Sequence, residues 1–389
     1  MNCGFALALL LAVGEGSPWL RAHWTDDHAT LEIASRAWSP QQGGHPLWLV
    51  GVAHIGDENF YRAVNAILEE SDTVVFESVL PEGGMPPSEA LPAERVEATQ
   101  STARLLATLL SGGTASHWNH RLAQIAEQDP RGASMARSLS RDGWGQPWHL
   151  VQRDEAWKVV SLGSDGQPGG EGEAADITVA IPEEKPIEAP GALQRTMADS
   201  LALTFQIDAM PYGNENWVPG DISIDQMEAA FAAHDVEVGD LGGLLQEEGF
   251  MGGMLSGILK MIPMLDAMLG GRIRDTMRVV LIEMLSQEEL IDAVMKQQGE
   301  AFAHVLLDLR NQRAAEVARV KLRDGSVALV YGAAHMEGLE SLLIDDQWAL
   351  LETRWLPAIT LDIRASALSP MEVEMLRRWV RSTTGSMMQ

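Results

Sequence analysis

The sequence predicts a mixed α/β protein in which two similar halves form one central sheet, flanked by helices and separated by a long, mainly helical insertion. Two observations carry this prediction. A short apolar strand, a Gly-x-x-His turn and a helix follow one another near residue 50 and again near residue 332. A further apolar run follows the first helix, and strand–helix–strand units normally build parallel sheets.

The first half contains predicted strands at 31–38, 47–50 and 73–76, where apolar and β-forming residues are concentrated. Asp57 is the expected N-cap of a helix, because apolar residues follow it at helical spacing. Glu77 comes directly after the last of these strands. Its carboxylate is therefore expected at the edge of the sheet where that strand ends.

The middle of the chain, from 85 to 300, has a mainly helical pattern and is predicted to be an insertion within one αβ domain at 27–365. A segment rich in Gly, Pro and Glu at 163–191 predicts a flexible acidic loop. Ser223 and Gln226 have the spacing of a capping box and predict the start of a helix.

The second half begins with a long helix predicted over 300–322. A buried strand is expected at 327–331, a helix at 337–343 and a further strand at 348–355. A capped helix then fills the C-terminal segment 366–389. The basic residues of that helix, which we expect to be solvated, are Arg377, Arg378 and Arg381.

Composition excludes several classes of function. The chain has 55 acidic and 28 basic side chains and a formal net charge of −27, so we expect no binding to nucleic acid. Cys3 is the only cysteine, which excludes an intramolecular disulfide and a cysteine-built metal site. We expect no transmembrane anchor, because charged residues and a proline interrupt the Met-rich apolar segment at 250–269.

The apolar run at 5–13 is too short to span a bilayer but has the length of a signal-peptide core. Residues 1–16 are therefore predicted to be a signal peptide, which implies export to the periplasm or the extracellular space. No Lys or Arg precedes the run, so the alternative is a buried first element in a cytoplasmic protein.

Three ionisable side chains are expected to meet where the strands end. His54 and His335 close turns that begin at Gly51 and Gly332, and small residues beside each histidine leave room for the imidazole. Glu77 is expected at the same edge, where sites form in open α/β sheets. Two imidazoles and one carboxylate suit a divalent metal ion, with Mn, Co or Zn as candidates. Such an ion activates water for hydrolysis.

Two segments carry these residues, LVGVAHIGDENFYRAVNAILEESDTVVFES and LVYGAAHMEGLESLL. They resemble the two halves of the TraB/GumN/Tiki family, which has a Gly-x-x-His in each half and a Glu that closes the first βαβ unit. The matching positions are His54, His335 and Glu77. The family's Arg-Asn or Arg-Asp pair is matched by Arg310 and Asn311. The resemblance implies a fold related to erythromycin esterase and to haem-binding lipoproteins, with metal-dependent proteases among the Tiki members.

These observations together predict a metal-dependent hydrolase, most simply a peptidase acting on a peptide or protein substrate. The ion would be held by His54, Glu77 and His335. Glu77 and Arg310 would take part in catalysis with Asn311, Arg310 by stabilising negative charge. Two alternatives stay open. One is a non-catalytic protein that binds haem or a small ligand, and the other is a metal-free esterase with a histidine as general base.

Overall fold

The computed structural model describes residues 19–78, 83–84, 87–90, 93–110, 139–153, 156–181, 202–212, 214–234, 264–286 and 299–387. The predicted signal peptide at 1–16 and most of the apolar segment 250–269 lie outside these ranges. The chain divides into two compact units. The first comprises Met1–Glu77, Pro190–Met210 and Ala230–Gln389, and the second comprises Ser78–Ala189 and Pro211–Ala229.

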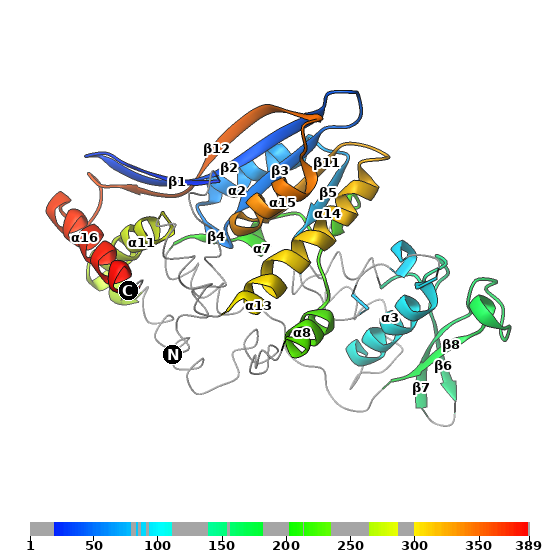
Figure 1. Ribbon diagram of the computed structural model, residues 1–389. Coiled ribbons are helices and arrows are strands. Elements are labelled where there is room, and N and C mark those ends of the chain that lie inside the picture. Colours follow the sequence, from blue (N-terminus) through cyan, green and yellow to red (C-terminus); the bar gives the residue numbers. More distant parts are fainter. Residues whose placement is uncertain are drawn as a thin grey trace. The chain divides into compact units, whose positions relative to one another are not determined.

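The first unit is built on a mixed sheet flanked by helices, which confirms the predicted fold class (Figure 1). β2 pairs antiparallel with β1, β3 and β12, whereas β11 runs parallel to both of its neighbours, β3 and β5. The strands of this unit's sheet, in spatial order, are β1 (Leu20–Trp24), β2 (His28–Pro40), β3 (Leu47–Val52), β11 (Val327–Gly332) and β5 (Thr73–Phe76), with β12 (Trp348–Asp362) also paired to β2.

The strand β11 lies between the two strands of the first βαβ unit. Val330 pairs with Val50 of β3 on one side and with Phe76 of β5 on the other. The two strands of this unit therefore lie parallel in one sheet, but they do not pair directly with each other. The reason is physical: a βαβ crossover can leave space for one strand between its own two, and β11 is buried along almost its whole length. Such continuous burial is typical of a strand covered on both faces.

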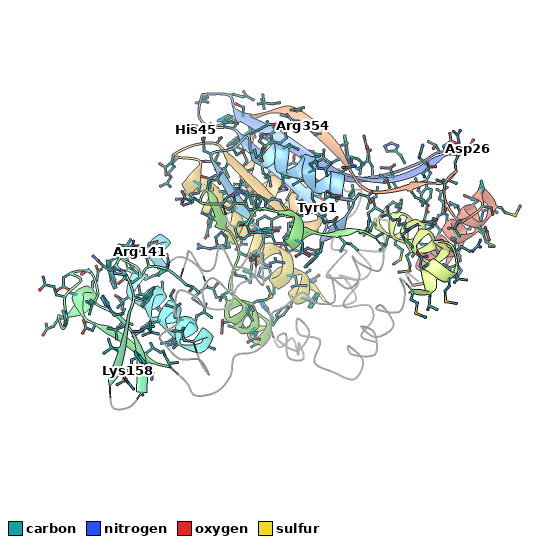
Figure 2. All side chains as sticks on the ribbon, turned by 180° about the vertical axis from the view of Figure 1, so that it is seen from behind. Asp26, His45, Tyr61, Arg141, Lys158 and Arg354 are labelled. Atoms are coloured by element: carbon teal, nitrogen blue, oxygen red, sulfur yellow. The ribbon has the colours of Figure 1, made fainter. Side chains whose placement is uncertain are left out.

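Helices cover both faces of this sheet. In Figure 1, α14 (Leu309–Lys321) and α15 (Met336–Leu343) lie in front of the strands, and α2 (Glu58–Leu68) lies on the opposite face, which Figure 2 shows. The short helix η5 (Ala333–His335) joins β11 to α15. The helix predicted over 300–322 is helical throughout 300–321, where α13 (Glu300–Ala303) passes through the π-helical turn η4 (His304–Asp308) into α14.

Asp57 stands at the N-cap position of α2 as predicted, but its carboxylate makes no capping hydrogen bond. Its Oδ2 accepts hydrogen bonds from the backbone N–H and the hydroxyl of Thr360, at 2.8 and 2.7 Å. Its Oδ1 accepts one from Nη1 of Arg278 at 3.0 Å. An ion pair with a largely buried arginine stabilises the carboxylate more than a helix N-terminus does, so Asp57 fixes α2 to β12 instead.

The long strands β2 and β12 continue past the central sheet, where α11 (Arg272–Leu285) and α16 (Pro370–Met387) pack against them (Figure 1). Near this end, β4 (Ile55–Gly56) pairs with β9 (Thr204–Phe205), and α7 (Gln206–Ala209) follows. The buried apolar side chains at this end include Leu31, Ile55, Phe205, Val279, Ile282, Ile359, Leu361 and Val373.

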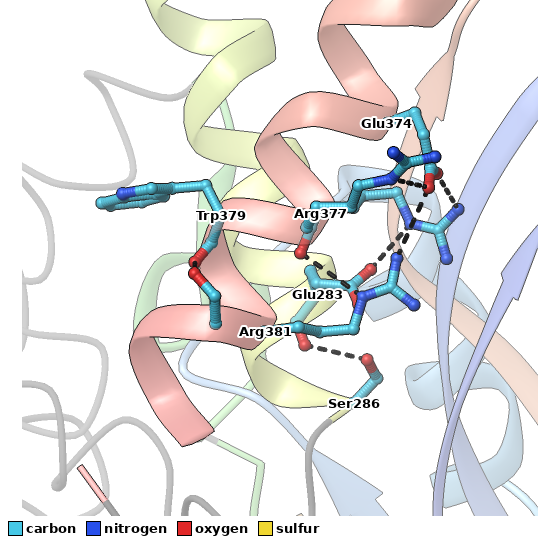
Figure 3. Close-up of polar contacts among 8 residues, drawn as sticks. Glu283, Ser286, Glu374, Arg377, Trp379 and Arg381 are labelled. Carbon is cyan, nitrogen blue, oxygen red and sulfur yellow. Dashed lines mark hydrogen bonds and ion pairs between the residues drawn. The ribbon is translucent and has the colours of Figure 1, made fainter. Parts of the chain in front are cut away.

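Two of the three arginines of α16 are not solvated as the sequence predicts (Figure 3), whereas the side chain of Arg378 is 76% exposed and contacts only Glu374 of the same helix among the contacts described. Nε of Arg377 and Nε of Arg381 both bond the carboxylate of Glu283, at 2.8 and 3.1 Å, and Glu283 is 4% exposed. The guanidinium of Arg377 also lies 4.0 Å from the centre of the Trp24 ring. A buried carboxylate on α11 needs a counter-charge, so these two arginines join the two helices.

The second unit contains a small antiparallel sheet with strand order β6 (His149–Arg153), β7 (Ala156–Ser161) and β8 (Ile177–Ala180). It packs against α3 (Arg95–Leu109). β8 lies within the segment 163–191, for which the sequence predicts no strand. The other elements are η1 (Pro87–Glu89), η3 (Gly172–Ala174), β10 (Trp217–Pro219) and the start of α8 (Ile224–Ala233).

The capping box at the start of α8 is confirmed. The backbone N–H of Ser223 donates to Oε1 of Gln226 at 3.0 Å, and the backbone N–H of Gln226 donates to the Ser223 hydroxyl at 3.1 Å. Each residue satisfies a backbone donor that the first turn of a helix leaves open.

Candidate functional site

The carboxyl ends of three neighbouring parallel strands bring the predicted residues to one edge of the sheet. His54 follows β3, Glu77 follows β5, and His335 lies just after β11, the strand between them. Oε1 of Glu77 lies 3.5 Å from Nε2 of His335. The structure therefore brings together two turns that are far apart in the sequence, at the place where α/β sheets form their sites.

Both oxygens of the Glu77 carboxylate are hydrogen-bonded. Nη2 of Arg310 donates to Oε1 at 2.6 Å, and the backbone N–H of Gly332 donates to Oε2 at 2.7 Å. The side chains of Glu77 and Arg310 are 11% and 10% exposed, so the ion pair is largely buried. Arg310, which the resemblance implied as a site residue, therefore lies against Glu77.

The pKa of Glu77 follows from these contacts. Burial by itself raises the pKa of a carboxyl group, and it is the largest single influence here. The positive charge of Arg310 and the nearby His335 and His54 outweigh it, so the pKa of Glu77 lies well below its ordinary value. Glu77 is therefore ionised at neutral pH, and it serves the site as a fixed negative charge and not as a proton donor.

His335 is held by both of its ring nitrogens. Nδ1 lies 2.7 Å from Oδ1 of Asn311, and Nε2 lies 3.3 Å from Nη1 of Arg310. An amide oxygen only accepts hydrogen bonds, so Nδ1 carries a proton and donates to Asn311, while Nε2 faces the guanidinium of Arg310. The ring also meets the ring of Tyr331 edge to face, and His335 is 4% exposed. Asn311 thus orients the imidazole of His335.

His54 has the same arrangement on the neighbouring strand. Its Nδ1 lies 3.1 Å from Oε1 of Gln206, so Nδ1 is the donor and Nε2 the basic nitrogen. The turn before it is fixed by the hydroxyl of Tyr61 on α2, which donates to the carbonyl oxygen of Ala53 at 2.7 Å. His54 is partly exposed, unlike His335, and it is the histidine that solvent can reach.

The two glycines predicted as turn residues have different roles. Gly332 ends β11, and a Cβ atom there would lie 3.2 Å from Oε2 of Glu77, so glycine permits the close approach of the carboxylate to the backbone. Gly51 lies inside β3 instead of in the turn. A Cβ atom at Gly51 would lie 2.8 Å from Cγ2 of Ile33, so this glycine serves the packing of the strand.

The predicted metal ion does not fit the side chains as they are placed. Among the residues that the structure describes, no three or more His, Cys, Asp or Glu side chains are arranged to hold a metal ion. Arg310 and the backbone of Gly332 take both oxygens of Glu77, and a guanidinium lies where a second cation would have to bind. A metal bound by His54, Glu77 and His335 stays a prediction.

Replacing Gly338 by alanine is expected to lower the free energy of unfolding by about 1–2 kcal/mol, because it forces a buried hydrogen bond apart. A Cβ atom at Gly338 would lie 2.4 Å from Nδ2 of Asn311, which is 3% exposed and bonded to His335. An alanine in a helix ordinarily stabilises it by up to about 1 kcal/mol, so the sign of the effect is diagnostic. Urea denaturation of both proteins measures it.

The matched control is Ser341→Ala, an exposed position on the same helix, where we expect a change of no more than about 0.5 kcal/mol. An increase in stability in Gly338→Ala would show that α14 and α15 do not pack as closely at Asn311 as the structure has it.

Comparison with known proteins gives one finding on family. The model of the family "Type II secretion system (T2SS), protein G" matches residues 119–180, whose described part includes β6, β7 and β8. It is consistent with an exported or envelope location. The match gives no support to the TraB/GumN/Tiki family, so that resemblance, and the metalloprotease identity that it implied, are corrected. No curated protein and no solved structure matches the chain.

The site residue that sequence reasoning missed is Gln206. It follows β9 and belongs to no motif, and its partner His54 precedes it by 152 positions. Nothing in the local sequence marks a lone glutamine as the partner of a distant histidine.

No described helix has both the length and the apolar character needed to cross a membrane.

Proposed function

We propose that the first unit is a metal-free esterase in which His54 acts as the general base. The observation that carries the proposal is the pair of anchored imidazoles. Both His54 and His335 have Nδ1 at hydrogen-bond distance from a side-chain amide oxygen, which makes Nδ1 the donor in each ring and leaves Nε2 of His54 as the basic nitrogen. Enzymes orient general bases in this way, with a second group fixing the tautomer.

His54 is the better base of the two because it is partly exposed and can meet water and substrate. Its Nε2 would take a proton from a water molecule as the water oxygen attacks the ester carbonyl. The same proton would then pass to the leaving alkoxide oxygen as the ester C–O bond breaks, so that a carboxylic acid and an alcohol are released. One histidine is sufficient for both transfers.

The buried group of Glu77, Arg310 and His335 would supply the electrostatics of the site. Arg310 carries the positive charge that stabilises a developing oxyanion, and Glu77 limits the cost of burying that charge. An arginine held by an ion pair is already in place before the reaction, so no reorganisation is needed when negative charge forms.

Hydrolysis that survives a chelator is the expected result. The purified chain is assayed with p-nitrophenyl acetate before and after exhaustive dialysis against EDTA, and metal content is measured by mass spectrometry. We expect the same rate in both samples. A rate that falls on dialysis and returns with Mn, Co or Zn would overturn the metal-free proposal, and no hydrolysis in either sample would overturn the esterase itself.

We infer further that the chain works in the periplasm or outside the cell. Two independent observations support this location: the apolar run at 5–13 with the length of a signal-peptide core, and the match of residues 119–180 to a secretion-system family.

A further inference from the structure

We propose that Gln206 is a positioning residue that fixes the tautomer of His54 and so decides which ring nitrogen faces the reaction. The inference rests on the proposed function for the role of His54 in catalysis, but the tautomer itself can be measured without a substrate. Gln206 is 4% exposed, and its Oε1 lies 3.1 Å from Nδ1 of the imidazole.

Gln206 is hydrogen-bonded to His54 through its backbone as well as through its side chain. The backbone N–H of Gln206 donates to the carbonyl oxygen of His54 at 2.8 Å. The next residues form the antiparallel pair β4–β9, in which Ile55 lies opposite Phe205. Gln206 and His54 are therefore joined through both main chain and side chain, and neither can move without the other.

Arg278 on α11 holds the two segments together from outside. Its Nη2 donates to the carbonyl oxygen of Ala202 at 2.9 Å, four residues before Gln206, and its Nη1 donates to Asp57 at 3.0 Å, three residues after His54. Ala202 has a φ of 50°, in the left-handed region that a non-glycine residue adopts only at a cost. The fold thus tolerates a strained backbone in order to place this segment.

The segment 202–209, which contains Gln206, is also fixed to α2. Nδ2 of Asn65 donates to the carbonyl oxygen of Ala209 at 3.0 Å, at the end of α7. This contact restrains the same segment without touching the imidazole, so Asn65 provides a control for general loosening. Comparing variants of Gln206 and Asn65 therefore separates the orientation of His54 from the general restraint of the segment 202–209.

The test is ¹⁵N NMR of the histidine side chains in the full chain, with the His54 signals assigned from their loss in His54→Gln. In the wild-type protein we expect the shift of a protonated nitrogen at Nδ1 and of an unprotonated nitrogen at Nε2. Gln206→Leu removes the acceptor, so the proton is expected to redistribute to Nε2. Gln206→Glu keeps an acceptor and is expected to keep the proton on Nδ1, whereas Asn65→Ala should leave the His54 signals unchanged.

A wild-type His54 with its proton on Nε2 would overturn the inference without any variant, and so would a Gln206→Leu protein that is folded and has unchanged His54 signals. In the ester assay, Gln206→Leu is expected to lower kcat about 10- to 100-fold with KM little changed, and Gln206→Glu to recover part of that loss. Absence of turnover in the wild-type protein would defeat the esterase proposal alone, since the NMR result judges Gln206 independently.

Discussion

Glu77→Gln is expected to lower the free energy of unfolding by about 3–5 kcal/mol at neutral pH, which is the range for breaking a buried ion pair at one partner. Glutamine has nearly the same shape, and its amide oxygen can still accept one hydrogen bond. What it lacks is the negative charge that balances Arg310, whose side chain is 10% exposed. The largely buried guanidinium would lose the negative charge that its Nη2 contacts at 2.6 Å, and urea denaturation measures the cost.

The same substitution at an exposed ion pair is the control. Glu58 and Arg62 are four residues apart on α2 and 2.8 Å apart at Oε1 and Nη2, with side chains 76% and 68% exposed. We expect Glu58→Gln to change the free energy of unfolding by no more than about 0.5 kcal/mol. Equal effects at the two glutamates would contradict the burial of the Glu77–Arg310 pair.

The pH dependence of the same variant follows from the lowered pKa of Glu77. A carboxyl group whose pKa is lower in the folded state contributes its full stability above the pKa of the unfolded chain, about 4.3 for glutamate. That contribution is lost as the pH falls from there through the folded-state pKa. The difference in stability between wild type and Glu77→Gln is therefore expected to be largest near pH 7 and to shrink below about pH 4.

His54→Ala is expected to lower kcat for ester hydrolysis about 10²- to 10⁴-fold, the usual contribution of a general base. The stability of the protein should change little, because His54 is partly exposed and its loss removes one hydrogen bond to Gln206. The measurement compares initial rates at saturating ester for proteins with matching unfolding curves.

His28→Ala, at an exposed histidine of β2, is the control and is expected to keep the wild-type rate. A His54→Ala protein that is folded and fully active would exclude His54 as the base. The remaining candidate for the general base would then be His335, whose Nε2 lies 3.3 Å from Nη1 of Arg310.

The parts of the fold that can be predicted from the sequence are those specified by local pattern. Continuous apolar runs predict β3, β5 and β11 within one or two residues of their observed bounds, because strands buried on both faces have no polar positions. The capping box before α8 is equally local. The pairing partner of each strand is not specified by local sequence, since nothing in residues 47–76 indicates that β11 pairs between β3 and β5.

The residues of the candidate site also fall into those that the sequence predicts and those that it does not. His54, Glu77 and His335 can be predicted because each follows a recognisable strand, and parallel strands end at one edge of the sheet. The partners that decide their chemistry come from elsewhere. Arg310 converts a predicted metal ligand into half of an ion pair, and Gln206 orients a histidine from a segment without a motif. Such partners depend on side-chain geometry, which a sequence pattern does not contain.

The position of β11 also has a consequence for the order in which the chain can fold. Residues 47–76 leave the ribosome early, but their two strands cannot close a sheet until residues 327–332 arrive to pair with both of them. The unpaired edges of β3 and β5 must wait through the synthesis of some 250 intervening residues, and pairings across such a distance form slowly. The site formed by Glu77, Arg310 and His335 is therefore among the last parts of the protein to form. A chain cut short before β11 could pair β1, β2 and β3, but it would lack both the join to β5 and the site.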